Sequence, residues 1–392
     1  MTDVDDKTDG ETTGAGITIT EDAPTPTPEV GDGSGGRRRW RIERRLQTPW
    51  WLDLGGIFAG LGMAVLTSAL LIAAAGSDVL DSYRALYDGA FGNRDSAVET
   101  LVQATPLIFT GLAAAFAFRA KVWNIGGEGQ LYAGAMGAYW ASLVLDESLP
   151  RILLIPACFV MAMLLGAGWA GIAAVLRTRF GVNEIITTVM LNFIVLNVLN
   201  FLLNGAWQDP ASFYAQTDRM SDVFGLPRLL STGRLHLGFV VAVATAFLVW
   251  FILARTSFGY EVRSIGANPR VASYGGIVSN RIIIATMLIS GAIAGLAGAS
   301  ELLGTQLRLQ PGISNDFGFT GIIIALVARL RPAGVIVAAI AAGALTNGAT
   351  TMQITTGVPA ALVDVITGLA LMFVLLTAVM VNYRIRRIQT DE

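Results

Sequence analysis

The chain has 392 residues, of which 53% are hydrophobic and only 14% are charged, and its formal net charge is -2. Soluble globular proteins carry about 25% charged residues, so the composition excludes that class and predicts a protein that crosses a membrane several times. The single Cys158 excludes an intrachain disulfide, and the single His236 argues against a histidine metal site. We expect neither a metal site nor a nucleic-acid partner.

The N-terminal segment has an acidic part and a basic part. Residues 1–36 are rich in Asp, Glu, Thr, Pro and Gly without an apolar period, which predicts disorder. Residues 37–45 contain six arginines and precede Trp50 and Trp51, a pattern typical of the cytoplasmic edge of a first span. The sequence thus predicts an extension over 1–48 that ends in a basic cytoplasmic segment, a membrane domain over 49–384, and a cytoplasmic tail over 385–392.

Ten apolar runs follow, each near the roughly 20 residues that a helix needs to cross the hydrocarbon core. They lie near 53–76, 100–118, 129–147, 152–176, 185–204, 237–254, 281–303, 317–330, 333–349 and 361–382. With a cytoplasmic N-terminus, 20 of the 27 lysines and arginines fall on the inner side and 7 on the outer side, as the positive-inside rule requires. We predict an all-α polytopic membrane protein with about ten transmembrane helices in two inverted halves and both termini cytoplasmic. The short eighth run is either a half-helix or a tilted span.

Polar residues interrupt these runs at several places. The string NIGGEGQ at 124–130 is costly beside membrane spans unless it lines a protein cavity. The predicted substrate pathway comprises Asn124, Glu128, Gln130, Asn183, Glu184, Thr188, Asn192, Glu301, Asn347 and Asp364. For any one of them, hydrogen bonding between helices or an interfacial position is an equal alternative. Glu128 is alternatively an anchor that accepts backbone hydrogen bonds where glycines break the third helix.

The longest inner loop, 255–281, is basic and contains an Asn-Pro turn. Asn268 is expected to cap a few helical turns that end before Gly275. Such a loop is either a docking element for a cytoplasmic partner or an ordinary solvated loop. The two lysines, Lys7 and Lys121, lie outside any G-x-x-x-x-G-K-[ST] motif, and the sequence contains no catalytic constellation. We therefore expect no enzyme activity, and any ATP hydrolysis has to come from another chain.

Four stretches resemble one known family. NIGGEGQ (124–130), GVNEIITTVMLNFI (181–194), GANPRVASYGGI (266–277) and the run 318–349 are similar, in order and spacing, to membrane subunits of bacterial ABC importers for branched-chain amino acids, simple sugars and nucleosides. The similarity extends from about residue 55 to 381 and is greatest to the nucleoside-importer permeases. It implies a type II-like importer permease in the bacterial cytoplasmic membrane. It also implies a cytoplasmic ABC ATPase that holds ATP and Mg, a second homologous permease and an extracytoplasmic substrate-binding lipoprotein, so this chain needs no cofactor.

The resemblance also implies roles for individual residues. Coupling to the ATPase falls on Arg263, Gly266, Asn268, Pro269, Tyr274 and Gly275. The expected substrates are nucleosides, with ribose-like sugars and branched-chain amino acids as alternatives. An alternative of another class is an ATPase-independent secondary transporter or channel that uses Glu128, Glu301 or Asp364 as proton sites.

Overall fold

The computed structural model describes residues 38–44, 49–230, 233–381 and 383–389. The disorder predicted for residues 1–36 lies outside these ranges. Strands β1 (Arg38–Arg44) and β2 (Tyr383–Gln389) pair as a two-stranded sheet, which the sequence did not predict. Residues 44–384 form one compact unit, and its regular structure is helical.

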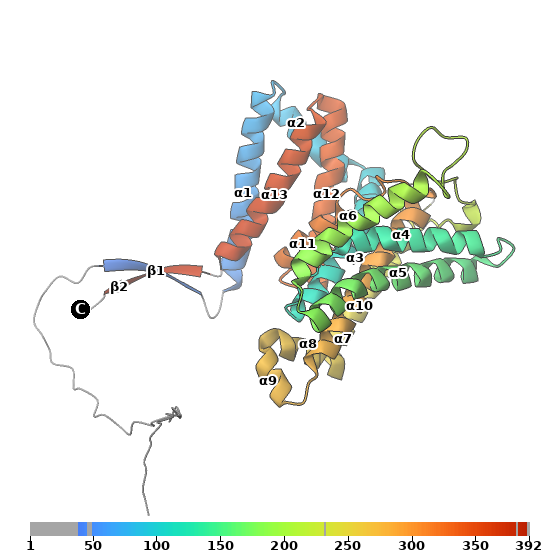
Figure 1. Cartoon of the computed structure of the whole chain (residues 1–392). Helices are drawn as coiled ribbons and strands as arrows, with labels where there is room; N and C mark the ends of the chain where they lie inside the picture. Colours follow the sequence, from blue (N-terminus) through green and yellow to red (C-terminus); the bar gives the residue numbers. More distant parts are fainter. Residues whose placement is uncertain (1–37, 45–48, 231–232, 382, 390–392) are drawn as a thin grey trace, which may run out of the picture. The chain divides into compact units, whose positions relative to one another are not determined.

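Each of the ten predicted apolar runs contains one helix (Figure 1). These helices are α1 (Trp50–Ala74), α3 (Arg94–Arg119), α4 (Gly127–Val144), α5 (Arg151–Phe180), α6 (Glu184–Leu203), α7 (Gly238–Arg255), α10 (Ser279–Glu301), α11 (Phe317–Val327), α12 (Pro332–Thr356) and α13 (Ala360–Met380). Shorter helices lie in the connections: α2 (Val79–Tyr87), η1 (Asp88–Gly92), η2 (Asp222–Phe224), α8 (Ser257–Ala267), α9 (Pro269–Tyr274) and η3 (Leu302–Gln306).

Seven helices in the described part of the chain are long and apolar enough to cross a membrane: α3, α5, α6, α7, α10 with η3, α12 and α13. The apolar part of α1, Phe58–Ala74, is shorter, and α4 begins with the polar Gly-Glu-Gly-Gln. α11 has 11 residues, or about 16 Å, which is half the hydrocarbon core. The multi-pass character is therefore confirmed, α11 has the length of a half-helix, and the count of ten spans stays a prediction.

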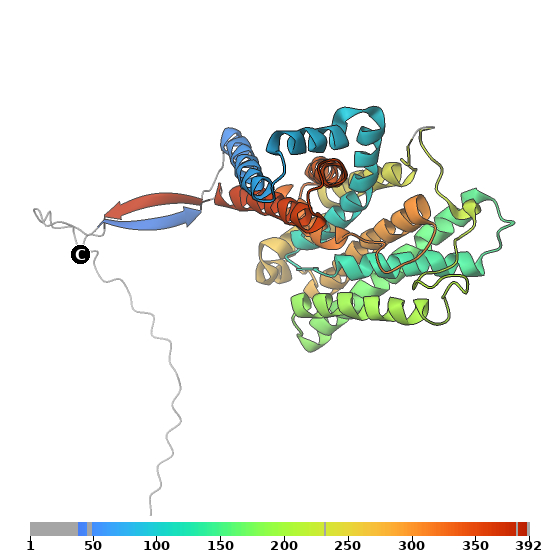
Figure 2. The same ribbon diagram turned by 90° about the horizontal axis from the view of Figure 1, so that it is seen from above.

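Corresponding helices of the two halves make corresponding contacts, each with helices of the other half. α3 packs on α11 and α12, while α10 packs on α4 and α5, and α3 and α10 pack on each other at the centre. Seen from above, α4, α5 and α10 lie side by side on one side of the bundle, while α1 and α13 pair on the other (Figure 2). This exchange is the pattern that two inverted halves of five helices produce.

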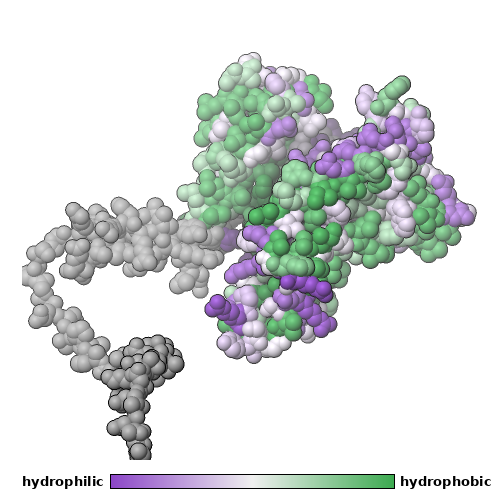
Figure 3. All heavy atoms as spheres, viewed as in Figure 1, coloured by the Kyte–Doolittle hydropathy of each residue, from purple (hydrophilic) through white to green (hydrophobic). Residues whose placement is uncertain are grey.

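Small residues bring α5 and α10 into close contact. A Cβ added to Gly166 would lie 2.4 Å from the carbonyl oxygen of Gly291, and one added to Gly295 would lie 2.3 Å from that of Ala162. Only glycine lets the two backbones approach this closely. On the surface, hydrophobic residues cover much of the helical walls, while hydrophilic residues gather around α8 and α9 (Figure 3).

Candidate functional site

The first turns of α4 and α11 meet inside the bundle. Oε2 of Glu128 accepts a hydrogen bond of 2.7 Å from the backbone N–H of Gly318, and Glu128 is only 4% exposed. A carboxylate between two helix N-termini is stabilised by the N–H groups and the dipoles of both. The predicted anchoring bond therefore exists, but its donor belongs to the other half of the chain rather than to the start of α4.

The backbones at this junction are in direct contact. A Cβ added to Gly318 would lie 2.2 Å from the backbone nitrogen of Glu128, whereas one added to Gly127 would meet nothing closer than 3.6 Å. From α3, the hydroxyl of Thr110 donates to the carbonyl oxygen of Phe317 at 2.8 Å. The first turn of α11 is thus held by α3 and α4 together.

A second set of bonds closes the turn that precedes α4. The side-chain amides of Asn124 and Gln130 bind each other through two hydrogen bonds of 2.9 Å. Asn124 also donates to Oγ of Ser290 on α10 at 2.9 Å and accepts from the backbone N–H of Gly126 at 3.0 Å. Ser290 in turn donates to the carbonyl oxygen of Ala113 on α3 at 2.7 Å. The break before α4 is therefore tied to both central helices.

α6 holds the same turn from the other side. Asn192 accepts from the backbone N–H of Gly129 at 2.8 Å and donates to the carbonyl oxygen of Ile125 at 3.0 Å. Thr188 accepts from the N–H of Ile125 at 3.3 Å. The bond to Gly129 satisfies one of the N–H groups that a helix start leaves open, and the two bonds to Ile125 fix the turn before it.

Five predicted pathway residues thus come together, and all five are buried: Asn124, Glu128, Gln130, Thr188 and Asn192. We call this set, with Ser290 and Gly318, the buried junction. Its polar groups bind one another and the backbone, so the arrangement holds a helix break. Ser290 was missed because it adjoins the small-residue run 291–298, which is typical of helix packing, and Gly318 because it was interpreted only as the start of a short apolar run. A hydroxyl within such a stretch was the available signal.

The other predicted pathway residues lie apart from the buried junction or at its edge. Asn183 caps α6 by accepting from the N–H of Ile185 at 2.9 Å, and Glu184 pairs with Arg177 at 2.7 Å. Glu301 ends α10, buried, and accepts from the hydroxyl of Thr305.

Two further members of the predicted set lie on the last two helices. Asn347 ties α12 to η1 and to the first turn of α3 by donating to the carbonyl oxygens of Gly89 and Ser96 at 2.7 and 3.0 Å. Asp364 is exposed on α13. The structure therefore joins half of the predicted set, and the pathway role of each residue stays a prediction.

His236, in the connection before α7, is a packing residue. It is 1% exposed, and its Nδ1 accepts from the backbone N–H of Gly238 at 3.2 Å. Burial, assisted by the positive charge of Arg234, lowers the pKa of His236 to about 4. The imidazole is therefore neutral near pH 7.

The predicted coupling loop folds into two short helices, α8 and α9. Asn268 caps α9 by accepting from the N–H groups of Arg270 and Val271 at 3.0 and 3.4 Å, which confirms the predicted cap. Pro269 is the first residue of α9, as its fixed φ favours. A Cβ added to Gly266 would lie 2.0 Å from the carbonyl oxygen of Arg119, so α8 is seated on the end of α3.

α9 exposes one aliphatic and one aromatic side chain among polar neighbours. Tyr274 is 93% exposed and Val271 is 64% exposed, while Arg263 on α8 and Gly275 after α9 are also exposed. Of the predicted coupling residues, Gly266 therefore positions the loop, Asn268 and Pro269 shape α9, and the other three are available to a partner.

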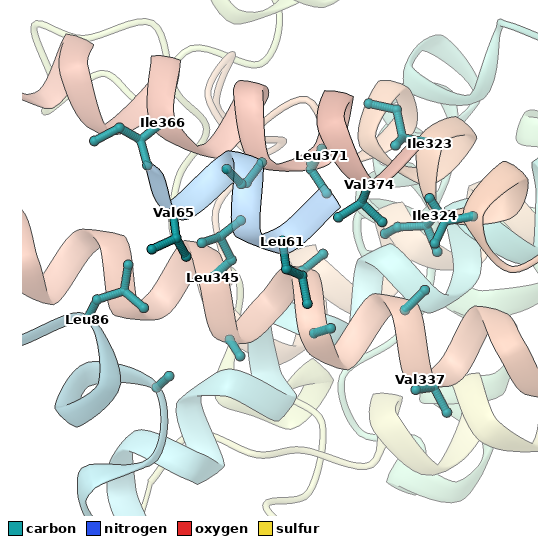
Figure 4. A pocket seen from close by; sticks show the side chains of 18 of the residues that line it. Leu61, Val65, Leu86, Ile323, Ile324, Val337, Leu345, Ile366, Leu371 and Val374 are labelled. Carbon is teal, nitrogen blue, oxygen red and sulfur yellow. The ribbon is translucent and has the colours of Figure 1, made fainter. Parts of the chain in front are cut away.

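A cavity of about 1060 Å³ lies between α1 and α13 on one side and α11 and α12 on the other (Figure 4). Aliphatic side chains dominate its lining, among them Leu61, Ile324, Leu345 and Leu371. It contains none of the predicted pathway residues. The lining also includes the polar side chains of Ser68, Tyr83 and Arg331, but apolar side chains make up most of it.

Comparison with known proteins shows extended similarity to membrane permeases. Residues 96–375 match the family described as branched-chain amino acid transport system / permease component. The chain is 37% identical over 318 residues to the guanosine ABC transporter permease protein NupP of Bacillus subtilis (strain 168), covering 80% of this chain and 90% of that protein.

Two further relatives have different named substrates. The nucleoside ABC transporter permease protein NupB of Lactococcus lactis subsp. cremoris (strain MG1363) is 31% identical over 79% of this chain and 87% of its own length. The glucose ABC transporter permease protein TsgB13 of Haloferax volcanii is 32% identical over 88% of this chain and 93% of its own length.

Proposed function

The chain belongs to the family of branched-chain amino acid transport system permease components, and we propose that it is the membrane permease subunit of an ATP-driven importer for nucleosides. The observation that supports the substrate is the 37% identity to NupP over nine tenths of the length of that guanosine permease. TsgB13 supports a simple sugar as the second candidate.

In this proposal, both termini and the α8–α9 loop face the cytoplasm, where an ABC ATPase docks on Val271 and Tyr274. Its movement reaches α3 through the contact of Gly266 with the carbonyl of Arg119. α3 and α10 then act on the buried junction, because Thr110 holds the start of α11 and Ser290 holds the turn before α4. This route connects ATP hydrolysis in the partner to the helix breaks at the centre of the permease.

The opposite end offers a contact for an extracytoplasmic binding protein. The connection 204–236 lies against the segment that precedes α11, with the N–H of Thr217 donating to Leu309 at 3.0 Å and that of Leu226 donating to Leu303 at 2.9 Å. A binding protein that presses on this connection would act on α11, whose first turn belongs to the buried junction.

Uptake into proteoliposomes tests the substrate. The permease is reconstituted with its ATPase, second permease and binding protein, ATP is enclosed, and entry of labelled guanosine is followed. Unlabelled nucleosides are expected to compete, whereas ribose, glucose and leucine are not. Competition by a sugar alone would assign the chain to sugar import, and uptake by this chain alone under a proton gradient would replace the proposal with a secondary transporter.

A separate variant tests the coupling surface. Tyr274→Ala removes a fully solvated ring and should leave folding unchanged, yet uptake and substrate-stimulated ATP hydrolysis should fall because the docking surface is lost. Tyr260→Ala, at a 62% exposed tyrosine on α8, is the matched control. Equal uptake by the two variants would contradict docking at α9.

A further inference from the structure

α6 has two faces of different character. Its buried face, which includes Asn192, Val195 and Leu199, packs on α4 and α5. Its opposite face is exposed and contains Phe193, Asn197, Asn200 and Phe201, which recur at the spacing of one helix face. The two phenylalanines are 57% and 79% exposed. We call these four residues the α6 stripe.

Amides on the α6 stripe are out of place for a surface that faces lipid. α6 is about 30 Å long, and Asn197 lies at its fourteenth residue, well inside the hydrocarbon core. Nδ2 of Asn197 donates to the carbonyl oxygen of Phe193 at 2.8 Å, whereas within the described part of the chain its Oδ1 has no partner. An unsatisfied polar group in hydrocarbon is costly, so this face requires a polar neighbour.

Two other helices show what a lipid-facing surface in this chain looks like. In the fully described stretch from Ile152 to Val175, α5 exposes only apolar residues, and α7 does the same until Arg255 at its end. α5, α6 and α7 are buried to the same extent, with 33% of the apolar stretch of each buried. The amides of α6 are therefore specific to its face and do not reflect a general tolerance of polar residues.

A closely packed protein helix fits the α6 stripe poorly. Membrane helix interfaces are rich in Gly, Ala and Ser, which let backbones approach, as the α5–α10 contact does. α6 contains none of these three residue types. A water-filled path satisfies the exposed amides without requiring close helix approach.

We propose that the α6 stripe is a wall of the translocation path and contacts the transported solute, an inference that rests on the proposed function. Each Phe ring gives a flat apolar surface on which a nucleobase stacks. Each Asn gives one donor group and one acceptor, which match the hydrogen-bonding edge of a base and the hydroxyls of ribose. Two rings and two amides on one helix face therefore suit a nucleoside better than an aliphatic amino acid.

Cysteine accessibility in the reconstituted transporter tests whether the stripe faces water. A charged, membrane-impermeant methanethiosulfonate should modify Asn197→Cys at least about tenfold faster than Leu164→Cys, because thiols react as thiolates in water. Leu164 is the matched control, since it is 60% exposed on α5. The native Cys158 is fully buried and measures the background in the unmodified chain. Equal, slow modification of both variants would overturn the proposal and indicate that lipid or the second permease covers the stripe.

The effect of transported solutes on the rate of cysteine modification distinguishes this inference from the proposed function. Guanosine delivered by the binding protein should slow modification of Asn197→Cys, and glucose should not. Protection by glucose alone would leave the α6 stripe as the path wall and overturn the nucleoside assignment. Rapid modification that no transported solute slows would overturn contact between the stripe and the solute.

A second variant keeps the test independent of cysteine chemistry. Phe201→Leu retains an apolar side chain but removes the stacking ring, so the concentration of guanosine for half-maximal uptake should rise by about tenfold. Leu164→Ala on α5 should leave it unchanged. An unchanged half-maximal concentration in Phe201→Leu would contradict stacking on this ring.

Discussion

Two asparagines five residues apart on α6 have opposite environments. Asn192 belongs to the buried junction, where it is 3% exposed and binds Ile125 and Gly129. Asn197 lies about 140° around the helix and is exposed, with a hydrogen bond only to its own helix in the described structure. A polar residue in a membrane helix is therefore structural when the chain itself closes its hydrogen bonds, and a candidate for solute contact when it does not.

The largest expected effect tests the backbone contact of the buried junction. Gly318→Ala forces a Cβ to within 2.2 to 2.7 Å of the backbone of Glu128 and Gly127, so we expect a loss of more than about 3 kcal/mol of stability. Gly127→Ala, on the other side of the same contact, has room and should be tolerated. Thermal unfolding in detergent measures both. Equal stability of the two variants would show that the helix starts are not in contact.

The same substitution of leucine for asparagine, made on the buried face and on the exposed face of α6, tests the difference between Asn192 and Asn197 directly. Asn192→Leu leaves the N–H of Gly129 and the carbonyl of Ile125 buried and unpaired, which should cost about 2 to 4 kcal/mol. Asn197→Leu should leave stability unchanged and lower uptake. Equal losses of stability in the two variants, or normal uptake by Asn197→Leu, would contradict the assignment of a structural role to Asn192 and of solute contact to Asn197.

A smaller effect is expected from the link between the buried junction and α10. Ser290→Ala removes the acceptor for Asn124 and the donor to the carbonyl of Ala113, so we expect a loss of about 1 to 2 kcal/mol. Ser142→Ala serves as the control, since among the described residues the Ser142 hydroxyl bonds only to Tyr139 of its own helix. Thermal unfolding of the two variants would reveal no difference if Ser290 were not part of the network.

The smallest effect is expected at the carboxylate of the buried junction. Glu128→Gln retains an oxygen that accepts from Gly318, so only the interaction of the charge with the helix dipoles is lost, about 1 kcal/mol. Uptake should be retained and should depend on pH as in the unmodified protein. Loss of uptake together with its pH dependence would instead identify Glu128 as a proton site. Glu128→Ala, which removes the acceptor, should be clearly less stable.

Local sequence signals located most helices and one cap. Apolar runs located ten helices with ends displaced by up to seven residues, the largest difference being at the end of α12, and Asn268 was identified as a cap because Asn-Pro has a strong local preference. α2 was missed, although Asp78 caps it by accepting from the N–H of Asp81, because nine amphipathic residues do not form an apolar run. β1 and β2 were missed because their pairing joins opposite ends of the chain.

The sequence by itself determined that the chain crosses a membrane, where its apolar helices lie and which family it resembles, since these depend on hydropathy and short motifs. Tertiary structure decided what the polar residues do. Asn124, Gln130 and Asn192 are equally polar in the sequence to Asn197 and Asn200, and only the packing of α4 against α6, α10 and α11 separates the satisfied amides from the exposed ones. The reason is that the cost of a polar group in a membrane depends on its hydrogen-bond partners, and these come from residues far away in the chain.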